Sequence, residues 1–340
     1  MMNKFTKYKL SILSCLALMF VGNAVIAQDL HFTQFMNNPL LTNPANTGFN
    51  PDNDYRIGVS YRNQWQSFPV PYKTMAAWGD VQIMRDAIQN GWFGVGGVIL
   101  RDEAGDGGLK STKVYGSVAY HQELGLGSLL SFGVNLGYAS KTVDFLKFKW
   151  ENQWNGKFFD SDAAIGENFA YSRIGYLDIQ AGLNYAYFAN DRLYLNAGAS
   201  IMHVNQPRES FFQNSANTVP FRYTGFANAS FKINDYWIVS PNAYYSQQAK
   251  ASEFVAGAMA QYNLSGDGDL QLIGGAYYRV GDAAAGMIGI EWNKIRVSFT
   301  YDATVSSVRN YVPGGAMEFS MIKFGSFNTG VPRNMRCPTF

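Results

Sequence analysis

The residues of this 340-residue chain that are able to do chemistry are few and widely spaced. The three histidines, His31, His121 and His203, stand far apart, and none has a metal ligand at the usual spacing. The sequence has neither a G-x-S-x-G nucleophile elbow nor an H-E-x-x-H zinc motif. A Ser–His pair that meets only in space stays open, although His203 has the strand parity of a membrane-interface residue. The sequence therefore predicts no cofactor and no metal, and favours a role that is not enzymatic.

Two other patterns resemble ligand sites. Residues 94–97 read Gly-Val-Gly-Gly, part of a nucleotide fingerprint, but they lie inside a predicted strand. Glycines in that position are expected to allow a close contact or strand curvature. Asp102, Glu103 and Asp106 lie in "RDEAGDGG", where Ca²⁺ is one alternative. Because no bidentate Glu closes this loop, the pattern favours ordinary turn chemistry.

Residues 1–27 are predicted to be a secretory signal peptide. Three lysines precede an apolar run over 10–21, and a small-residue cleavage site ends at Ala27 and leaves Gln28 as the mature N-terminus. A lipoprotein cysteine at Cys15 is the alternative, but Cys15 lies within the apolar run. Removing the leader takes away three of 27 basic residues and no acidic one, so 24 face 25 acidic residues. This balance excludes nucleic acid as the expected partner. Only Cys337 remains, so no intramolecular disulfide is possible.

The composition of the mature chain predicts a transmembrane β-barrel. The sequence has 34 glycines and 16% aromatic residues, and its 15% of charged residues is well below the roughly 25% of soluble domains. Beyond the leader no run of 18 apolar residues exists, so no transmembrane helix is expected. Residues 174–187 instead alternate apolar and polar side chains with a period of two, and the same pattern recurs along the chain.

The repeating pattern predicts an all-β fold, an antiparallel transmembrane barrel of about fourteen strands over residues 54–325. The predicted strands are 54–64, 72–84, 91–102, 111–123, 127–141, 172–188, 192–204, 219–233, 236–248, 251–264, 268–281, 283–292, 294–304 and 313–325. Connections after even-numbered strands are mostly short, and the longest ones follow odd-numbered strands. Bacterial barrels place short turns in the periplasm, so both termini are expected there, including a tail over 326–340.

The longest predicted loop, residues 142–171, is rich in aromatic side chains. Aromatic residues at this density indicate either packing within the loop, as a lid over the barrel mouth, or a surface for a partner.

Residues 28–53 precede the first predicted strand and have neither helical nor strand periodicity. A fourteen-stranded barrel has a lumen wider than its own side chains fill, so we expect this segment to fold into the barrel or to cap its periplasmic mouth. Asn38-Pro39 and Asn43-Pro44 are expected to form turns, because proline disfavours helical geometry in the residue before it. The inward parity of Arg62 predicts a partner in the lumen or in this segment.

These residues carry a family resemblance. The opening motif comprises Gln28-Asp29, Phe32, Gln34, Phe35, Met36, Asn38-Pro39, Asn43-Pro44-Ala45 and Gly48, and the second is Tyr61-Arg62-Asn63-Gln64-Trp65. Both motifs resemble the opening of the PorP/SprF family, whose pattern is Q-D-x-x-F-x-Q-Y-M-x-N-P-x-x-x-N-P-A-x-x-G followed by Y-R-N-Q-W. Here Phe35 replaces the usual Tyr, and Asn46-Thr47 replaces an aromatic-small pair.

The resemblance implies an integral outer-membrane protein of the type IX secretion and gliding machinery. Its expected partners are other subunits of that machinery, membrane lipid and the C-terminal domain of a secreted adhesin. Tyr61 and Trp65 are alternatively rim anchors, and the opening motif is either plug structure or a partner surface. An outer-membrane transporter of small or hydrophobic solutes is the main alternative function, and a surface hydrolase is the third.

Overall fold

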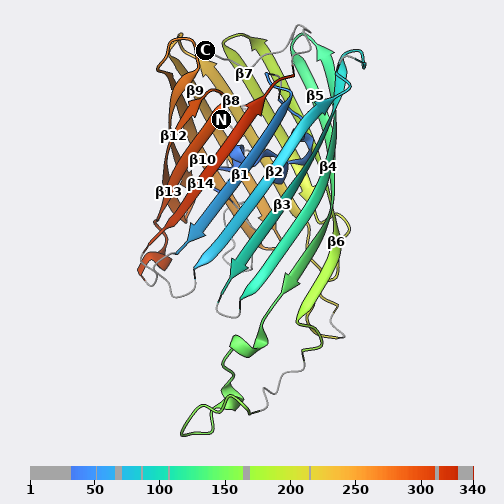
Figure 1. Cartoon of the computed structure of the whole chain (residues 1–340), viewed down its shortest axis with the longest axis vertical. Coiled ribbons are helices and arrows are strands. Elements are labelled where there is room, and N and C mark those ends of the chain that lie inside the picture. Colours follow the sequence, from blue (N-terminus) through green and yellow to red (C-terminus); the bar gives the residue numbers. More distant parts are fainter. Residues whose placement is uncertain are drawn as a thin grey trace, which may run out of the picture.

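The computed structural model describes residues 32–50, 52–65, 71–85, 87–105, 108–163, 169–213, 216–310, 314–327 and 340. Over these residues the chain forms a closed antiparallel barrel in which each strand pairs with its sequence neighbours and β14 pairs with β1 (Figure 1). The strands are β1 (Tyr55–Gln64), β2 (Tyr72–Ile83), β3 (Gly91–Ala104), β4 (Leu109–Gly125), β5 (Ser128–Thr142), β6 (Arg173–Asn190), β7 (Leu193–Met202), β8 (Arg222–Lys232), β9 (Trp237–Gln248), β10 (Ala251–Asn263), β11 (Leu270–Arg279), β12 (Ala283–Trp292), β13 (Ile295–Thr304) and β14 (Ala316–Gly325). The predicted closed barrel of fourteen strands is confirmed.

The barrel wall follows the predicted alternation. On β6, Leu177 and Leu183 are exposed on the outer face, whereas Asp178 and Asn184 are buried on the inner face. A closed barrel pairs every strand edge, so an apolar band can face lipid without leaving backbone groups unbonded.

Part of the inner wall departs from the expected polar lumen. On β8 to β12 several inward side chains are apolar and form one buried cluster beside polar inward residues such as Asn242 and Glu253. The wall residues of this cluster are Phe226, Tyr244, Val255, Ile273, Tyr277, Ala285 and Met287. Outward positions on the same strands are often small, including Ala227, Ala243, Ala258, Ala276 and Gly286. The alternation in the sequence does not reveal that this part of the wall is apolar on the inside. Its period of two is the same as elsewhere, and only the sizes of the inward and outward side chains are exchanged.

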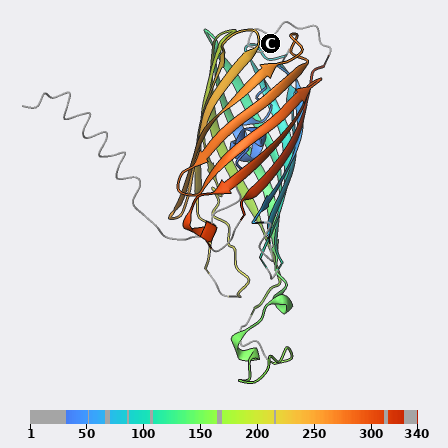
Figure 2. The same ribbon diagram turned by 90° about the vertical axis from the view of Figure 1, so that its left-hand side faces the viewer.

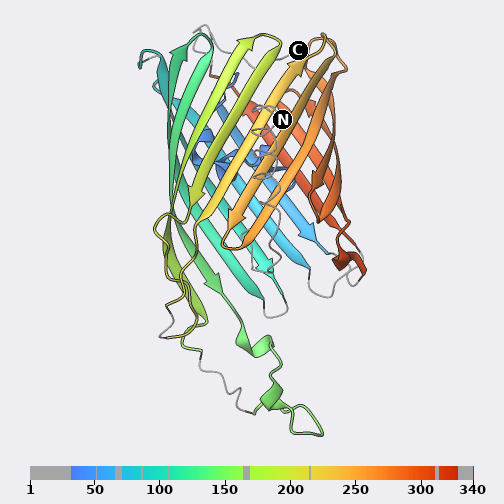
Figure 3. The ribbon, with the colours of Figure 1, turned by 180° about the vertical axis from the view of Figure 1, so that it is seen from behind.

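The two ends of the barrel differ in their connections. At the short-turn end β12 and β13 are joined by Asn293 and Lys294, both with positive φ, as a two-residue hairpin turn requires. The long-loop end carries the segments 143–172 and 203–221. Phe340 lies at the short-turn end (Figures 1 and 3). The signal peptide, Ala27, Gln28 and residues 328–339 of the predicted tail lie outside the described residues.

Short helical turns precede the first strand. They are η1 (Phe35–Asn37), α2 (Pro39–Thr42) and η2 (Pro44–Asn46), and they belong to residues 32–50, which we call the lumen segment. None of the helices in the described ranges has the length and apolar character needed to cross a membrane.

The lumen segment lies inside the barrel, in the middle part of its length (Figure 2). Thr33 contacts Glu318 and Asp302 near the long-loop end, and Asp54 N–H donates to the carbonyl of Gly325 at the short-turn end. The segment therefore lies inside the barrel and does not cap the short-turn mouth. Its described start is in the long-loop half.

Candidate functional site

Asn-Pro pairs set the local geometry of the lumen segment. Pro39 and Pro44 each occupy the first turn of a short helix, where a missing N–H costs nothing. Asn43 precedes η2, and its side-chain oxygen accepts a hydrogen bond from Ala45 N–H at 2.9 Å. The Thr42 hydroxyl donates to the carbonyl of Phe35 at 2.9 Å and ties α2 to η1. The predicted turns are present.

A charged cluster holds the long-loop end of the segment. We define it as Arg62, Glu253, Arg279, Asp302 and Glu318, all buried on the inner wall. Arg62 pairs with Asp302 at 3.0 Å and with Glu318, and Arg279 pairs with Glu253 at 2.8 Å and with Asp302 at 3.3 Å. Buried charges are tolerated only when they are paired, and each member of this network has a partner of opposite charge.

The backbone of the segment completes that network. The N–H groups of Thr33 and Gln34 donate to the two oxygens of the Glu318 carboxylate, at 2.6 and 2.9 Å. The Thr33 hydroxyl donates to Asp302 at 2.6 Å and accepts from Arg62 and Arg279. Removing the segment would leave these charged groups without some of their partners, so the cluster is matched to it.

A second set of contacts holds the short-turn half. His121 Nε2 lies 2.8 Å from the carbonyl of Thr47, and its Nδ1 lies 2.7 Å from the Ser131 hydroxyl. Nε2 must donate to the carbonyl, so in a neutral ring Nδ1 accepts from Ser131. Trp92 stacks on His121 with centroids 4.9 Å apart and donates to the carbonyl of Gly48 at 3.1 Å. His121 is thus a structural histidine of the lumen wall.

Inward glycines let the segment approach the wall closely. A Cβ added at Gly94 would lie 1.9 Å from the Thr47 carbonyl oxygen, and one at Gly133 would lie 2.4 Å from the Pro44 carbonyl. At Gly182 it would lie 1.9 Å from the Asn43 side-chain oxygen. The glycine-rich strand motif therefore serves a close backbone contact and forms no strand–helix phosphate loop.

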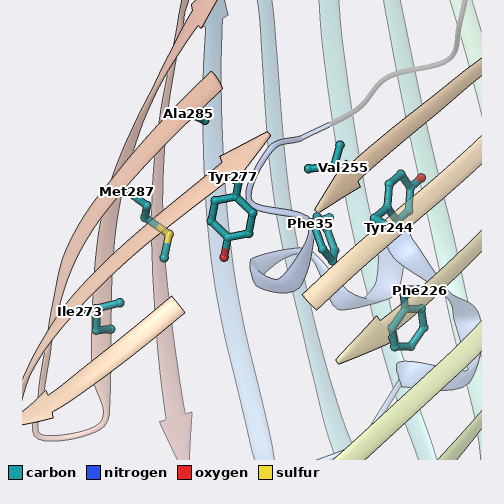
Figure 4. Close-up of a cluster of buried hydrophobic side chains, with 8 residues drawn as sticks. All are labelled: Phe35, Phe226, Tyr244, Val255, Ile273, Tyr277, Ala285 and Met287. Atoms are coloured by element: carbon teal, nitrogen blue, oxygen red, sulfur yellow. The ribbon is translucent and has the colours of Figure 1, made fainter. Parts of the chain in front are cut away.

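Apolar packing fixes the centre of the segment. Phe35 stacks on Tyr244 with centroids 5.2 Å apart and meets Tyr277 edge-on at 6.4 Å (Figure 4). It is the only member of the buried cluster drawn in Figure 4 that the segment supplies, and the others come from β8 to β12. Phe35 therefore packs against the apolar part of the inner wall.

The structure brings most of the predicted motif residues together. Phe32, Gln34, Phe35, Asn38, Pro39, Asn43, Pro44 and Ala45 are all buried in the lumen. Arg62 joins them through Thr33, and Gln64 accepts from Arg62 at 3.1 Å. Tyr61 and Asn63 have the opposite strand parity, and Trp65 packs on Tyr72 at the long-loop rim with centroids 5.4 Å apart. Sequence reasoning missed Thr33 and Glu318, although inward parity marks Glu318 as a buried charge.

The predicted interfacial position of His203 is wrong. Its side chain is buried, and Nδ1 lies 2.9 Å from Asp178 Oδ1 on the inner wall. β7 ends at Met202, and His203 has φ of 60°, so strand parity no longer sets the direction of its side chain.

The aromatic loop between β5 and β6 is ordered by its own side chains. It includes η3 (Phe145–Lys147) and η4 (Glu151–Gln153). Phe145 stacks on Phe169 with centroids 3.8 Å apart and meets Phe211 of the β7–β8 loop edge-on at 6.0 Å. The described part of the loop extends away from the barrel and does not cover its mouth (Figures 1 and 3), so the predicted lid is wrong and the predicted self-packing holds at the base.

The tip of this loop is preorganised. Trp154 and Phe159 form an isolated bridge, and the Asn155 side chain accepts from the backbone N–H groups of Lys157 and Phe158. The side chains of Trp154 and Phe158 are 56% and 60% exposed. The loop therefore presents two exposed aromatic side chains on a hydrogen-bonded turn beyond the barrel.

Comparison with known families identifies the chain. The model of the family described as "Type IX secretion system membrane protein PorP/SprF" matches residues 24–322. The chain belongs to the PorP/SprF family. Together with the barrel, this membership makes it an integral outer-membrane protein of a type IX secretion family. No curated protein matches this PorP/SprF chain.

Solved structures share the fold of this PorP/SprF barrel at low identity. A TodX deltaS2S3 mutant monoaromatic hydrocarbon channel has a TM-score of 0.52 and 10% identity, over 84% of this chain and 93% of that one. The toluene transporter TbuX of Ralstonia pickettii has a TM-score of 0.50 and 13% identity, over 89% and 96%. The CymD monoaromatic hydrocarbon channel has a TM-score of 0.51 and 10% identity, over 86% and 93%. At these identities the likeness concerns the fold alone.

Proposed function

We propose that this barrel is a non-enzymatic component of the type IX secretion and gliding machinery that assists the export or surface anchoring of secreted adhesin-type proteins. Its partners in this role are other subunits of that machinery and the C-terminal domain of an adhesin, and lipid surrounds its outer wall. Family membership supports the assignment to the machinery.

The lumen segment is the observation that carries the proposal. It is fixed by the charged cluster, by the Phe35 cluster and by inward glycines that meet its backbone. The segment would have to leave these contacts before a polypeptide could pass through the lumen. The barrel therefore acts through its rim and loops, as a partner or an anchor of the exported protein.

Two measurements test the proposal. Purification of the full chain in mild detergent should recover secretion subunits or an adhesin C-terminal domain, and recovery of neither would contradict the role. In single-channel recordings, deletion of residues 28–48 should raise the conductance, since the plug would be gone. An unchanged conductance would contradict the closing role of the segment and leave the partner test intact.

A transporter of small or hydrophobic solutes is the second candidate. Its support is the shared fold with the hydrocarbon channels, together with an apolar inner wall on β8 to β12. Transport would require the segment to move. Growth-linked uptake of a monoaromatic hydrocarbon that is lost on deleting the barrel would favour this candidate over the secretion role.

A further inference from the structure

Charged side chains on the outer face of the barrel gather at one place. The alternation along the fourteen strands gives six charged residues outward parity. One of them, Lys323, stands alone near the short-turn end of β14. The others lie at the long-loop ends of strands within the sector from β2 to β6 (Figure 1), and we call them the outer charged cluster: Lys73, Arg101, Glu103, Lys110 and Arg173.

Strand pairing brings the members of this cluster together. Lys73 is the register partner of Glu103 across β2 and β3, and Glu103 is the register partner of Lys110 across β3 and β4. The same row continues across β5 to Arg173 of β6. Arg101 lies one outward position nearer the middle of β3, and diagonal neighbours in a sheet are about 7–8 Å apart, within reach of long side chains. The ends of Lys73, Arg101 and Lys110 are therefore able to reach one bound group.

The positive charge of the cluster exceeds its negative charge. Lys110 Nζ lies 3.6 Å from Glu103 Oε1, and the two side chains are 39% and 43% exposed, so this pair contributes little. Arg173 Nε donates to a serine hydroxyl of β5 at 3.2 Å, which is a neutral partner. Lys73 and Arg101 are exposed, and no carboxylate in the described part of the chain pairs with either of them. Four cations thus share one acid.

Apolar side chains lie next to the cluster on the side of the barrel middle. Met75 is the next outward residue after Lys73 on β2, Ile99 is the next one from Arg101 on β3, and Val114 continues the band on β4. Their exposed fractions are 49%, 54% and 46%. Because the long loops of bacterial barrels lie outside the cell, the cluster faces the outer leaflet, where lipid head groups meet the hydrocarbon.

The remaining wall has no charge at this level. On β7 to β14 the outward strand residues of the long-loop half are uncharged, and exposed tyrosines occur there instead, including Tyr223, Tyr278 and Tyr301. Tyrosine is a common anchor at the membrane interface and has no charge with which to select a lipid. Cations that served only as anchors would not need to be confined to one sector. Their restriction to β2–β6 favours a binding site.

We propose that the outer charged cluster binds the phosphate group of an anionic lipid in the outer leaflet, and that the apolar residues beside it contact the acyl chains. Ammonium and guanidinium groups form strong charge-assisted hydrogen bonds with phosphate, and basic clusters next to a membrane attract anionic head groups. This site is separate from the secretion role and does not require it. Because Arg173 begins β6, the lipid is bound on the side of the barrel from which the aromatic β5–β6 loop extends.

Native mass spectrometry of the full chain in mixed detergent–lipid micelles tests the site. The probes are dioleoyl phosphatidic acid, dioleoylglycerol, which has the same chains without the phosphate, and inorganic phosphate. At equal concentration the chain should retain phosphatidic acid about fivefold more than dioleoylglycerol, or better. Equal retention of the two lipids would mean that the cluster is only an interfacial anchor. Retention of inorganic phosphate equal to that of phosphatidic acid would mean that a free anion binds. Either result would overturn the proposal.

Variants locate the binding. A cation near an anionic membrane surface changes the affinity roughly fivefold, so the Lys73→Gln, Arg101→Gln double variant should retain at least tenfold less phosphatidic acid. The control is Lys294→Gln with Lys323→Gln, which removes two exposed lysines at the short-turn end. Glu103→Gln removes the acid of the cluster and should raise the retention, which a merely structural role would not do. Equal losses in the two double variants, or an unchanged retention in Glu103→Gln, would reject the site.

Discussion

Arg62 and Glu318 are register partners across the pairing of β1 with β14, where the barrel closes, and their side chains form a buried ion pair. The exposed fractions of the two side chains are 4% and 2%. The same Glu318 carboxylate accepts the backbone N–H groups of Thr33 and Gln34. The Glu318 carboxylate therefore takes part both in the pairing that closes the barrel and in the binding of the lumen segment.

We expect Arg62→Met to release the long-loop end of the segment. The substitution leaves Asp302 and Glu318 with one cation fewer, and breaking a buried pair in this way costs about 3–5 kcal/mol. Thiol labelling of a Met36→Cys reporter in a Cys337→Ser background should be faster with Arg62→Met than with Arg62 intact. The control is Arg296→Met, which removes an inward arginine far from Thr33. Equal labelling rates in both backgrounds would show that the cluster does not hold the segment.

The sequence alone predicts that Arg62 points into the lumen, but it does not predict that Glu318 is its partner. The parity of Arg62 places it in the lumen, and the period-two pattern yields the closed fourteen-stranded barrel. Glu318 is 256 residues away, and only ring closure makes it the neighbour of Arg62. The packing of Phe35 could not be predicted either. The wall residues that contact it come from five strands, and the alternation of those strands looks ordinary in the sequence. His203 shows a different limit, since a single positive φ reverses the direction predicted from parity.

We expect Gly94→Ala to displace the short-turn half of the segment. The new Cβ would lie 1.9 Å from the Thr47 carbonyl oxygen, a backbone atom, so the segment itself has to shift. Overpacking of this kind costs about 1–3 kcal/mol. Gly274→Ala is the matched control, because a Cβ on that glycine meets no atom within 4 Å. Single-channel conductance should rise, and the melting temperature should fall, in Gly94→Ala only. A stable and closed Gly94→Ala barrel would contradict the close contact.

We expect His121→Leu to weaken the same half of the segment through hydrogen bonding. The variant leaves the buried Thr47 carbonyl without its imidazole donor, which costs about 1–3 kcal/mol. Thermal unfolding in detergent measures the loss.

Assays for ester hydrolysis on the parent and on the His121→Leu, His203→Leu double variant should give the same background rate. A rate that falls in the double variant would revive the surface hydrolase as a function.

We expect Phe145→Ala to loosen the base of the aromatic loop and to leave the barrel intact. Phe145 stacks on Phe169 and meets Phe211, so its removal takes away one link between the β5–β6 loop and the β7–β8 loop, while the Phe169–Phe212 contact remains. An aromatic pair contributes about 0.5–1.5 kcal/mol beyond its buried area, so tryptic cleavage within residues 143–163 should be about two- to twelvefold faster. Trp154→Ala at the exposed tip is the control and should keep the parental rate.

We expect the exposed aromatic side chains at the tip of the β5–β6 loop to bind a partner protein. Buried aromatic anchors carry much of the energy of protein interfaces, and a preorganised loop loses little entropy when it binds. The Trp154→Ala, Phe158→Ala double variant should therefore recover at least tenfold less partner protein in mild detergent, with an unchanged melting temperature. Val204→Ala with Val280→Ala is the control, since it removes two exposed apolar side chains at the same end of the barrel. Equal losses in both double variants would mean that the tip contributes no specific contact, and full recovery in the tip variant would place the partner surface elsewhere on the rim.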